Sequence, residues 1–409
     1  MITEKIELRG HVIDTGQLGR TLDDILEAGG EYLVERFVLG RSKGDDSYAR
    51  IEVQAPDQPT LRAIMFRLTQ LGVTAVDPKD ATLEPAPSDG VFPEGFYAST
   101  NLETFVRIGG DWAPVANPEM DCALVVNADG VRTVPMCDVR AGEMVVVTSS
   151  GVKVSPPKVT AIEEESVFEF MNSVVSSEKP QALLVRQIAE EMRKTKEAGK
   201  EILWVGGPAI VHTGGAQAMC DLVNAGYCNV LFAGNALATH DIEASMYGTS
   251  LGVDLSKGSG VEHGHEHHLR AINRIRSYGS IPNAVAAGAL TSGIMHAMVQ
   301  NGQPFVLVGS VRDDGPLPDV YTDVIAGQRA MRGAIGNVGF AIMVATMLHA
   351  IGTGNLLPAS IPLVCVDINP ATVTKLADRG SSHATGVVTD IGLFLEQLAD
   401  ALVPDRHRG

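Results

Sequence analysis

Four short stretches, ILWVGG (202–207), VLFAG (230–234), FVLVGS (305–310) and LVCVD (363–367), decide the fold of this chain. Each is an apolar run without polar alternation that ends in glycine or aspartate. Strands that are apolar throughout are typical of a parallel sheet covered by helices on both faces. Ligands of such sheets bind outside the carboxyl ends of the strands, so we expect the function to reside just after these four strands.

The loops after the first and last of these strands carry groups that suit a nucleotide. GGPAIVHTGG (206–215) is rich in glycine, which lets backbone N–H groups approach an anion closely. Its spacing is not GxGxxG, and a tight turn without a ligand stays open as an alternative. Asp367 ends the last strand, where an acid in dinucleotide folds accepts the ribose hydroxyls.

The residues after the second strand combine small and ionisable side chains. Asn235 and Ala236 are small enough to admit a dinucleotide, and Asn235 offers both a donor and an acceptor. His240, Asp241 and Glu243 bring three ionisable groups to the same edge of the sheet. We expect His240 to touch substrate, with a satisfied surface histidine as the alternative.

The run GSVRDDGPLPD (309–319) after the third strand is the most unusual in the chain. It sets Arg312 beside Asp313 and Asp314 in a loop stiffened by glycine and proline. Its carboxylates can fix a substrate ammonium group, and the loop can instead hold a ribose or an amide. The alternative interpretation is a solvated acidic turn.

A cluster of histidines invites a metal site. His263 and His267 have the i, i+4 spacing of helical metal ligands, and His265 and His268 are three residues apart. A glycine between them breaks a helix, and no nearby cysteine or aspartate completes a ligand set. We therefore expect no metal here, and interpret the run as a polar helix start or an active-site loop.

The first 83 residues predict a smaller α+β unit. Strands are expected over 5–14, 31–39, 47–54 and 73–76, and helices over 18–28 and 58–71. This βαββαβ order is the split βαβ pattern of a ferredoxin-like unit. The unit holds no cluster of catalytic residue types, so regulation, substrate gating or oligomer contact is its expected role.

The chain as a whole is predicted to be an α/β protein of three domains. A turn-rich linker, PAPSDG (85–90), follows the ferredoxin-like unit, and Asp129-Gly130 indicates a hairpin in a small β-rich domain. A helical connection over 179–198 leads into the parallel-sheet domain. The predicted boundaries are 1–84 for the ferredoxin-like unit, 85–178 for the β-rich domain and 179–409 for the α/β domain.

Charge and composition exclude some classes of function. The formal net charge of −17 argues against a nucleic-acid-binding protein, which needs clustered lysine and arginine. The most apolar stretch, 333–357, is broken by glycines, and we interpret it as buried core helix and turn rather than a membrane span. Five scattered cysteines without a CxxC pair indicate free, buried thiols, so we expect a cytoplasmic protein.

Several long runs together resemble the archaeal-type, NAD-dependent ornithine cyclodeaminases of the LOR/SDH bifunctional-enzyme domain family. The runs that carry the resemblance are LFAGNALATHDIE (231–243), SVRDDGPLPDV (310–320), TMLHAIGTGNLLPA (346–359), VDINP (366–370) and SSHATGVVTD (381–390). The N-terminal part is similar to the LOR/SDH domain, so the resemblance covers almost the whole chain. It implies that the C-terminal domain has a Rossmann-type, deoxyhypusine-synthase-like NAD-binding fold.

The resemblance also implies which residues contact the NAD cofactor. Carried over by motif, these are Asn235, Ala236, Asp314, Thr346, Met347, Leu348, His349, Asp367, Asp390 and Ile391. Asn235, Ala236, Asp314 and Asp367 follow or end the strands singled out above. Thr346 to His349 lie in the run that composition alone interprets as buried helix.

The implied reaction converts L-ornithine to L-proline and ammonia, with NAD consumed and regenerated in one turnover. Such chemistry needs a group near the δ-ammonium to remove a proton at neutral pH. Asp313, His240 and Asp241 are the candidates for this base or clamp. Arg312 is the candidate for holding the substrate carboxylate, although it has neighbouring aspartates with which to pair.

Two other classes of function remain open at this point. One is a different NAD enzyme on the same scaffold, acting on lysine, saccharopine or another amino acid. The other is a non-catalytic sensor of NAD or an amino acid, because a ferredoxin-like unit is a common ligand-sensing shape. The expected partners are a small amino-acid substrate and, by analogy, further copies of the chain in a homo-oligomer.

Overall fold

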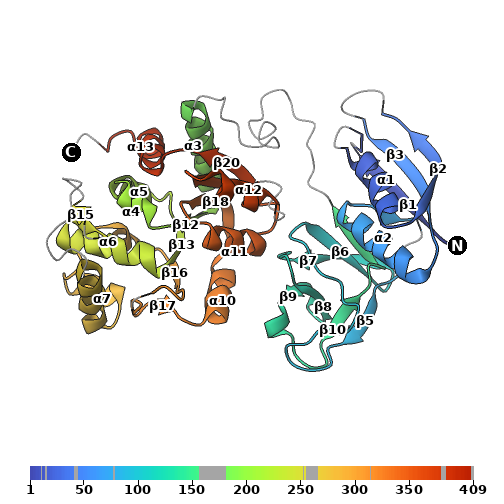
Figure 1. The fold of residues 1–409 in the computed structure, drawn as a ribbon, viewed down its shortest axis with the longest axis horizontal. Coiled ribbons are helices and arrows are strands. Elements are labelled where there is room, and N and C mark those ends of the chain that lie inside the picture. Colours follow the sequence, from blue (N-terminus) through green and yellow to red (C-terminus); the bar gives the residue numbers. More distant parts are fainter. Residues whose placement is uncertain are drawn as a thin grey trace. The chain divides into compact units, whose positions relative to one another are not determined.

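The computed structural model describes residues 1–10, 12–13, 16–40, 45–76, 79–155, 181–251, 253–254, 266–313, 315–378 and 384–406. By its contacts the chain divides into two units (Figure 1). Unit 1 comprises Met1–Ser166 with Asn355–Ser360, and unit 2 comprises Val167–Gly354 with Ile361–Gly409.

The first part of unit 1 is the expected ferredoxin-like fold. Its elements are β1 (Ile2–Gly10), α1 (Gln17–Glu27), β2 (Glu31–Val38), β3 (Ser47–Ala55), α2 (Gln58–Gln70) and β4 (Thr74–Ala75). The strands form an antiparallel sheet in the order β2-β3-β1-β4, as the split βαβ pattern requires. The sequence prediction of 5–14 placed the first strand too late in the chain. The strand ends at Gly10, whose φ of 121° is not that of an extended strand.

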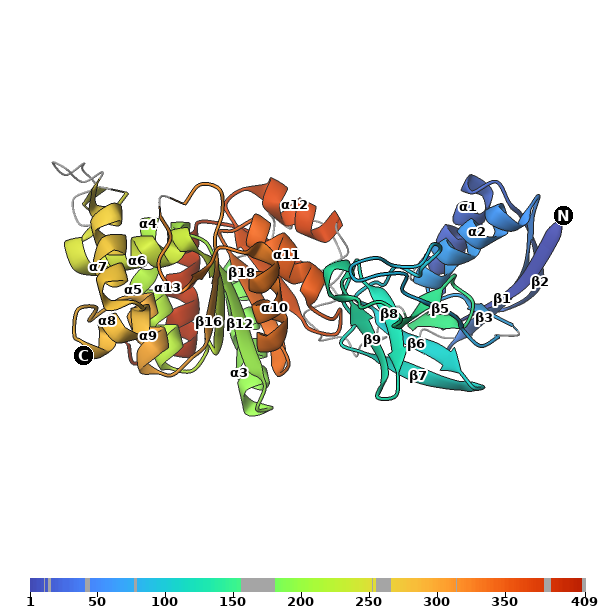
Figure 2. The same ribbon diagram turned by 90° about the horizontal axis from the view of Figure 1, so that it is seen from below.

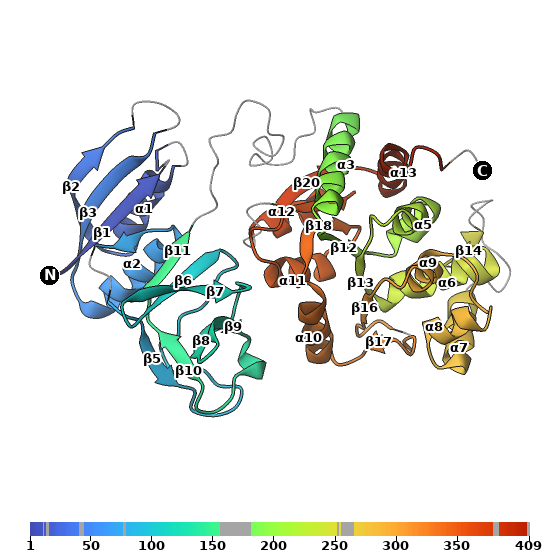
Figure 3. The same ribbon diagram turned by 180° about the vertical axis from the view of Figure 1, so that it is seen from behind.

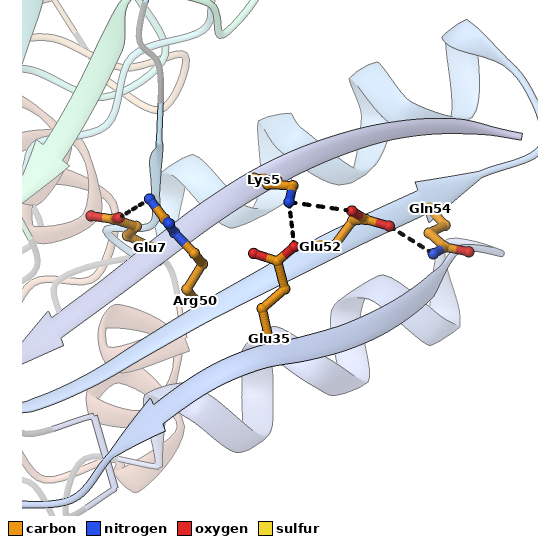
Figure 4. Close-up of polar contacts among 6 residues, drawn as sticks. All are labelled: Lys5, Glu7, Glu35, Arg50, Glu52 and Gln54. Carbon is orange, nitrogen blue, oxygen red and sulfur yellow. Dashed lines mark hydrogen bonds and ion pairs between the residues drawn. The ribbon is translucent and has the colours of Figure 1, made fainter.

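The two faces of this sheet differ. Ile6, Leu8, Ile51 and Val53 pack in a buried core with apolar residues of α1 and α2. The opposite face, here called the open face, carries the polar network of Figure 4. In it Lys5 pairs with both Glu35 and Glu52 across the strands. Arg50 pairs with Glu7 at 3.0 Å, and the Gln54 amide donates to Glu52 at 2.9 Å.

The rest of unit 1 is a mostly β structure. Its strands are β5 (Thr82–Pro85), β6 (Glu103–Ile108), β7 (Asp111–Ala116), β8 (Ala123–Asn127), β9 (Gly130–Val134), β10 (Met144–Val147) and β11 (Val152–Ser155), in the order β11-β6-β7-β9-β8-β10-β5. The predicted hairpin joins β8 and β9, with Asn127 opposite Gly130. The segment Asn355–Ser360 belongs to this unit through hydrogen bonds between Asn101 and both Leu357 and Ala359.

Unit 2 is built on a seven-stranded sheet. Its strands are β12 (Glu201–Gly206), β13 (Val230–Gly234), β16 (Phe305–Val308), β17 (Val320–Tyr321), β18 (Val338–Val344), β19 (Leu363–Asp367) and β20 (Ala384–Val388), and a separate small hairpin pairs β14 (Thr249–Ser250) with β15 (Val253–Asp254). The order β17-β16-β13-β12-β18-β19-β20 can be followed in Figure 3, and every neighbouring pair is parallel. Six of the strands follow the Rossmann order, which reverses between β12 and β18, with β17 added at one edge.

Helices cover both faces of this sheet (Figure 2). They are α3 (Gln181–Glu197), α4 (Ala209–His212), α5 (Ala216–Asn224), α6 (Asn235–Tyr247), α7 (His267–Tyr278), α8 (Ile281–Ala286), α9 (Ile294–Gln300), α10 (Val324–Ala334), α11 (Leu348–Leu356), α12 (Pro370–Asp378) and α13 (Ile391–Leu402). One hydrophobic core contains residues of the helices from α3 through α9, of α13 and of the sheet. On the other face α10 lies close enough that a Cβ on Gly327 would meet Val308.

Two further sequence-based expectations were wrong, one for this sheet and one for a cysteine of unit 1. The apolar run 333–357 is not continuous helix and turn: it holds the central strand β18, followed by α11. A strand covered on both faces has no period that separates it from a buried helix, which explains the error. The cysteines were expected to be buried, but Cys137 of unit 1 is exposed while the other four are buried. The glycine-rich loop 206–215 contains the short helix α4. Among the described residues no helix is long and apolar enough to cross a membrane.

Candidate functional site

The carboxyl ends of the parallel strands bring most of the candidate residues to one edge of unit 2. Helix α6 starts at Asn235 directly after β13, and no side chain caps its first turn. Asn235 is buried, and its Oδ1 accepts a hydrogen bond from the Leu317 N–H at 3.0 Å. This bond ties the start of α6 to the loop after β16. Ala236, half-buried, follows in the first turn, whose free N–H groups are suited to an anion.

The loop after β16 holds the acidic candidates. Asp313 is half-buried, and its Oδ2 accepts from the Ser310 N–H at 2.8 Å. Arg312 is exposed and, within the described part of the chain, makes no ion pair with Asp313. The guanidinium is therefore not held by its described neighbour. Asp314 lies outside the described residues.

The loop after β18 supplies four more candidates. Thr346 and Met347 are half-buried, and the side chain of Leu348 is exposed. His349 lies beside the end of β13, because a Cβ on Gly234 would come within 3.2 Å of its ring. Burial lowers the pKa of His349, while a hydrogen bond with the Val308 backbone and the charge of Asp313 oppose the shift. His349 thus connects three strand ends.

Strands β12 and β18 meet tightly at the point where the strand order reverses. Gly207 follows β12, and a Cβ built on it would lie 1.8 Å from the carbonyl oxygen of Ala345, just after β18. Ala345 itself has φ 54°, a left-handed conformation that is uncommon for a residue other than glycine. The backbone therefore leaves no room for a side chain at residue 207.

The last two strands place the remaining NAD candidates at the same edge. Asp367 is the final residue of β19, and its Oδ1 accepts from the Asn369 N–H at 2.8 Å. Asp390 caps α13 by accepting from the Leu393 N–H at 2.9 Å. Ile391 begins α13 and is buried.

Helix α6 carries two buried carboxylates with different surroundings. Asp241 accepts from the N–H groups of Ile294 and Met295, each at 2.8 Å, so it holds the start of α9. Burial raises the pKa of Asp241 to about 6, against the effect of these two bonds. Glu243 instead accepts from the imidazole of His240, with Nδ1 2.9 Å from Oε2.

Two further histidines lie beside His240: His212, which sequence reasoning did not select, and His268, which it considered only as part of the histidine run. The rings of His212 and His240 lie 4.8 Å apart, and those of His240 and His268 lie 6.4 Å apart. Burial and His240 both lower the pKa of His212, while Glu243 raises it. The i, i+3 spacing of His240 and Glu243 on a predicted helix was the available signal for this group.

The histidine run before α7 is only partly visible. His263 and His265 lie outside the described residues, while His267 begins α7 and stacks on Tyr247 with ring centroids 4.9 Å apart. In the described part of the chain no group of three histidine, cysteine, aspartate or glutamate residues is arranged to hold a metal ion.

Three family models match the chain in succession. The LOR/SDH bifunctional enzyme conserved region matches residues 3–102. The first region of the arginine dihydrolase ArgZ-like C-terminal part matches 103–185, and its Rossmann fold matches 186–398. The three matches are contiguous and cover nearly all of the chain.

Curated relatives align with the chain from end to end. An ornithine cyclodeaminase of Methanothermobacter thermautotrophicus is 50% identical over 97% of this chain and 96% of the relative. One from Methanopyrus kandleri is 49% identical over 98% and 97%. The bifunctional arginine dihydrolase/ornithine cyclodeaminase AgrE of Nostoc sp. is 44% identical over 97% of this chain, which spans 58% of that protein.

Solved structures share the fold. The apo structure of cyanobacterial ArgZ, an arginine dihydrolase, matches 98% of this chain and 58% of its own with a TM-score of 0.85 at 38% identity. A conserved putative LOR/SDH protein from Methanococcus maripaludis matches 79% of this chain and 98% of its own, with a TM-score of 0.74 at 48% identity. A ternary complex of AgrE with ornithine and NAD⁺ covers 100% of this chain and 58% of its own, with a TM-score of 0.54 at 41% identity.

The sheet order, the grouping of polar residues at one sheet edge and these matches agree. The Rossmann-type domain and the ferredoxin-like unit occupy the same parts of the sequence as the matching family models. The chain therefore belongs to the ArgZ-like C-terminal, LOR/SDH family, whose curated archaeal members are named ornithine cyclodeaminases.

Proposed function

We propose that this protein is an NAD-dependent ornithine cyclodeaminase, which converts L-ornithine to L-proline and ammonia. The observation that carries the proposal is the single carboxyl edge of the parallel sheet, where dinucleotide-binding groups and ionisable side chains lie together. The ornithine cyclodeaminase at 50% identity over nearly the full length of both chains supports the choice of substrate.

The carboxyl edge fits a dinucleotide. The uncapped first turn of α6 presents N–H groups to a phosphate. One carboxylate oxygen of Asp367 accepts from Asn369, and the other accepts from none of the described residues and is available for ribose hydroxyls. We propose that NAD contacts Asn235, Ala236, Asp314, Thr346, Met347, Leu348, His349, Asp367, Asp390 and Ile391.

The reaction assigns distinct tasks to the residues of this chain. NAD, when bound, supplies the hydride acceptor for Cα of ornithine and returns the hydride before the product leaves. Ring closure requires the δ-ammonium to lose a proton so that its nitrogen can attack Cα. We propose His240 as the proton acceptor and Asp313 as a clamp for the ammonium group, because both carry a polar atom at this edge.

Two other candidates take separate roles. Arg312 has no described ion-pair partner, so its fork of N–H donors is proposed to hold the substrate carboxylate. Asp241 is proposed to be structural, because both of its oxygens accept from backbone N–H groups of α9.

The organisation of the chain is also part of the proposal. We retain domain boundaries near 84 and 178, with the qualification that Asn355–Ser360 joins unit 1 by its contacts. Four buried free thiols support a cytoplasmic location, because thiols persist in a reducing compartment. A homo-oligomer is proposed as well.

The test is proton NMR of L-ornithine with the purified full chain, stripped of bound cofactor, in the presence and absence of NAD⁺. We expect proline only when NAD⁺ is added, and no net accumulation of NADH. Accumulating NADH would identify an ordinary dehydrogenase, and unchanged ornithine in the presence of bound NAD would reject the cyclodeaminase.

A further inference from the structure

The carboxylate of Glu243 lies at the centre of a buried polar network on α6. Its side chain is completely buried, and it accepts from three donors: His240 Nδ1, the Thr249 hydroxyl at 2.9 Å and the Leu251 N–H at 3.2 Å. The Thr249 oxygen also lies 2.8 Å from His267 Nδ1. Burying a carboxylate is costly unless hydrogen bonds compensate. The network meets this requirement with donors from three separate residues.

The bond to Glu243 determines which nitrogen of His240 is basic. A carboxylate only accepts hydrogen bonds, so Nδ1 of the neutral imidazole must carry the proton that it donates to Glu243. The lone pair is then on Nε2. His240 therefore presents a proton acceptor on the side away from Glu243.

Among the described residues, the charged and titratable groups packed around His240 come from three elements. They are Glu243 of α6 itself, His212 of α4 and His268 of α7. His212 lies six residues after the end of β12, and His240 lies six residues after the end of β13. These two strands are neighbours in the sheet. Both therefore lie in segments that follow the carboxyl ends of these strands, and His212 is fixed by a 2.6 Å contact between its Nδ1 and the Ser250 hydroxyl.

We propose that Glu243 is a positioning residue that holds His240 with Nε2 ready to take the proton lost by the δ-ammonium of ornithine. An N–H bond of the ammonium breaks and one forms at Nε2, while the electron pair stays on the δ-nitrogen. That pair attacks Cα, which is an iminium carbon once its hydride has left, and the C=N π pair moves to the α-nitrogen, which later departs as ammonia. The resulting imidazolium faces the Glu243 carboxylate, which stabilises its charge. This inference rests on the proposed function.

The test compares Glu243→Gln and Glu243→Asp with wild type, using the full chain with NAD⁺ over a range of pH. For Glu243→Gln we expect kcat to fall about 10²- to 10⁴-fold, the range lost when a positioned base or its orienting acid is removed. The acid limb of the kcat/KM profile should move to lower pH, because the amide does not stabilise an imidazolium. Glu243→Asp keeps a carboxylate and should recover part of kcat.

Two controls separate positioning from folding. Glu191→Gln makes the same change in an ion pair of α3 with Lys194, and should leave kcat unchanged. NAD⁺ binding, followed by fluorescence titration, should be the same in Glu243→Gln as in wild type. An acid limb that does not move, or a Glu243→Asp variant as impaired as Glu243→Gln, would reject the positioning role.

A readout without substrate keeps this inference distinct from the proposed function. The proton resonances of the His240 ring, assigned with His240→Asn, should titrate at lower pH in Glu243→Gln than in wild type. If wild type makes no proline, the proposed function and the proton transfer are both rejected, and this titration alone decides whether Glu243 positions His240. Identical titrations would reject that as well.

Discussion

The open face of the ferredoxin-like sheet and the carboxyl edge of the parallel sheet are both rich in charge, yet they differ in burial. On the open face, Lys5 and Arg50 pair with glutamates across the strands, and these side chains are between 21% and 48% exposed (Figure 4). At the carboxyl edge the side chain of Glu243 is 0% exposed and that of His240 10%. Exposed ion pairs contribute little to the free energy of folding. A buried pair is costly to desolvate, so it persists only where hydrogen bonds compensate for the lost water. Burial, and not the number of charges, distinguishes the candidate site.

The same contrast recurs within α6. Asp241 and Glu243 are two residues apart and both buried, but Asp241 binds backbone N–H groups and Glu243 binds an imidazole. A carboxylate satisfied by backbone stabilises the fold. A carboxylate satisfied by a titratable ring can also act on that ring's protonation.

The largest expected effect tests the tightness of the carboxyl edge. Gly207→Ala should destabilise the protein by several kcal/mol, about 3 or more, and abolish NAD⁺ binding, because the new Cβ would overlap the Ala345 carbonyl. Urea unfolding and fluorescence titration measure the two effects. Gly333→Ala, in α10 with nothing near its Cβ position, is the control and should be neutral or stabilising. Unchanged NAD⁺ binding in Gly207→Ala would remove this loop from the site.

An intermediate effect separates the two carboxylates of α6. Asp241 has a pKa raised to about 6 in the folded state, so the folded protein takes up a proton more readily than the unfolded chain. Its contribution to stability is fully present below about pH 4 and is lost as the pH rises through 6. Between pH 5 and pH 7.5, wild type should therefore lose about 1 kcal/mol relative to Asp241→Asn, measured by urea unfolding. Parallel pH profiles of the two proteins would contradict this assignment.

The smallest effect is expected on the open face. Lys5→Met removes the pairs with Glu35 and Glu52, but these groups are solvated, so turnover should be unchanged and the thermal midpoint should fall only slightly. About 0.5 M NaCl should produce a similar small fall in wild type by screening. A loss of proline formation in Lys5→Met would show that this face is functionally coupled to the site and would break the comparison.

Local sequence patterns determined much of the architecture. The apolar runs that end in glycine or aspartate became β12, β13, β16 and β19, since a parallel strand covered on both faces needs no polar residue. The alternating N-terminal strands and amphipathic helices defined the ferredoxin-like unit, because periods of 2 and 3.6 residues follow directly from backbone geometry. Residues placed after strands, such as Asn235 and Asp367, could be predicted to share an edge for the same reason.

Only the tertiary structure decided the partners of each side chain. Sequence could not separate β18 from a buried helix, and could not distinguish Asp241 from Glu243, two residues apart on one helix. It also gave no sign that His212 and His268 lie beside His240, because α4, α6 and α7 meet only through the folded core. Secondary structure is encoded in neighbours along the chain, whereas hydrogen bonds, burial and ring contacts arise between residues far apart in sequence.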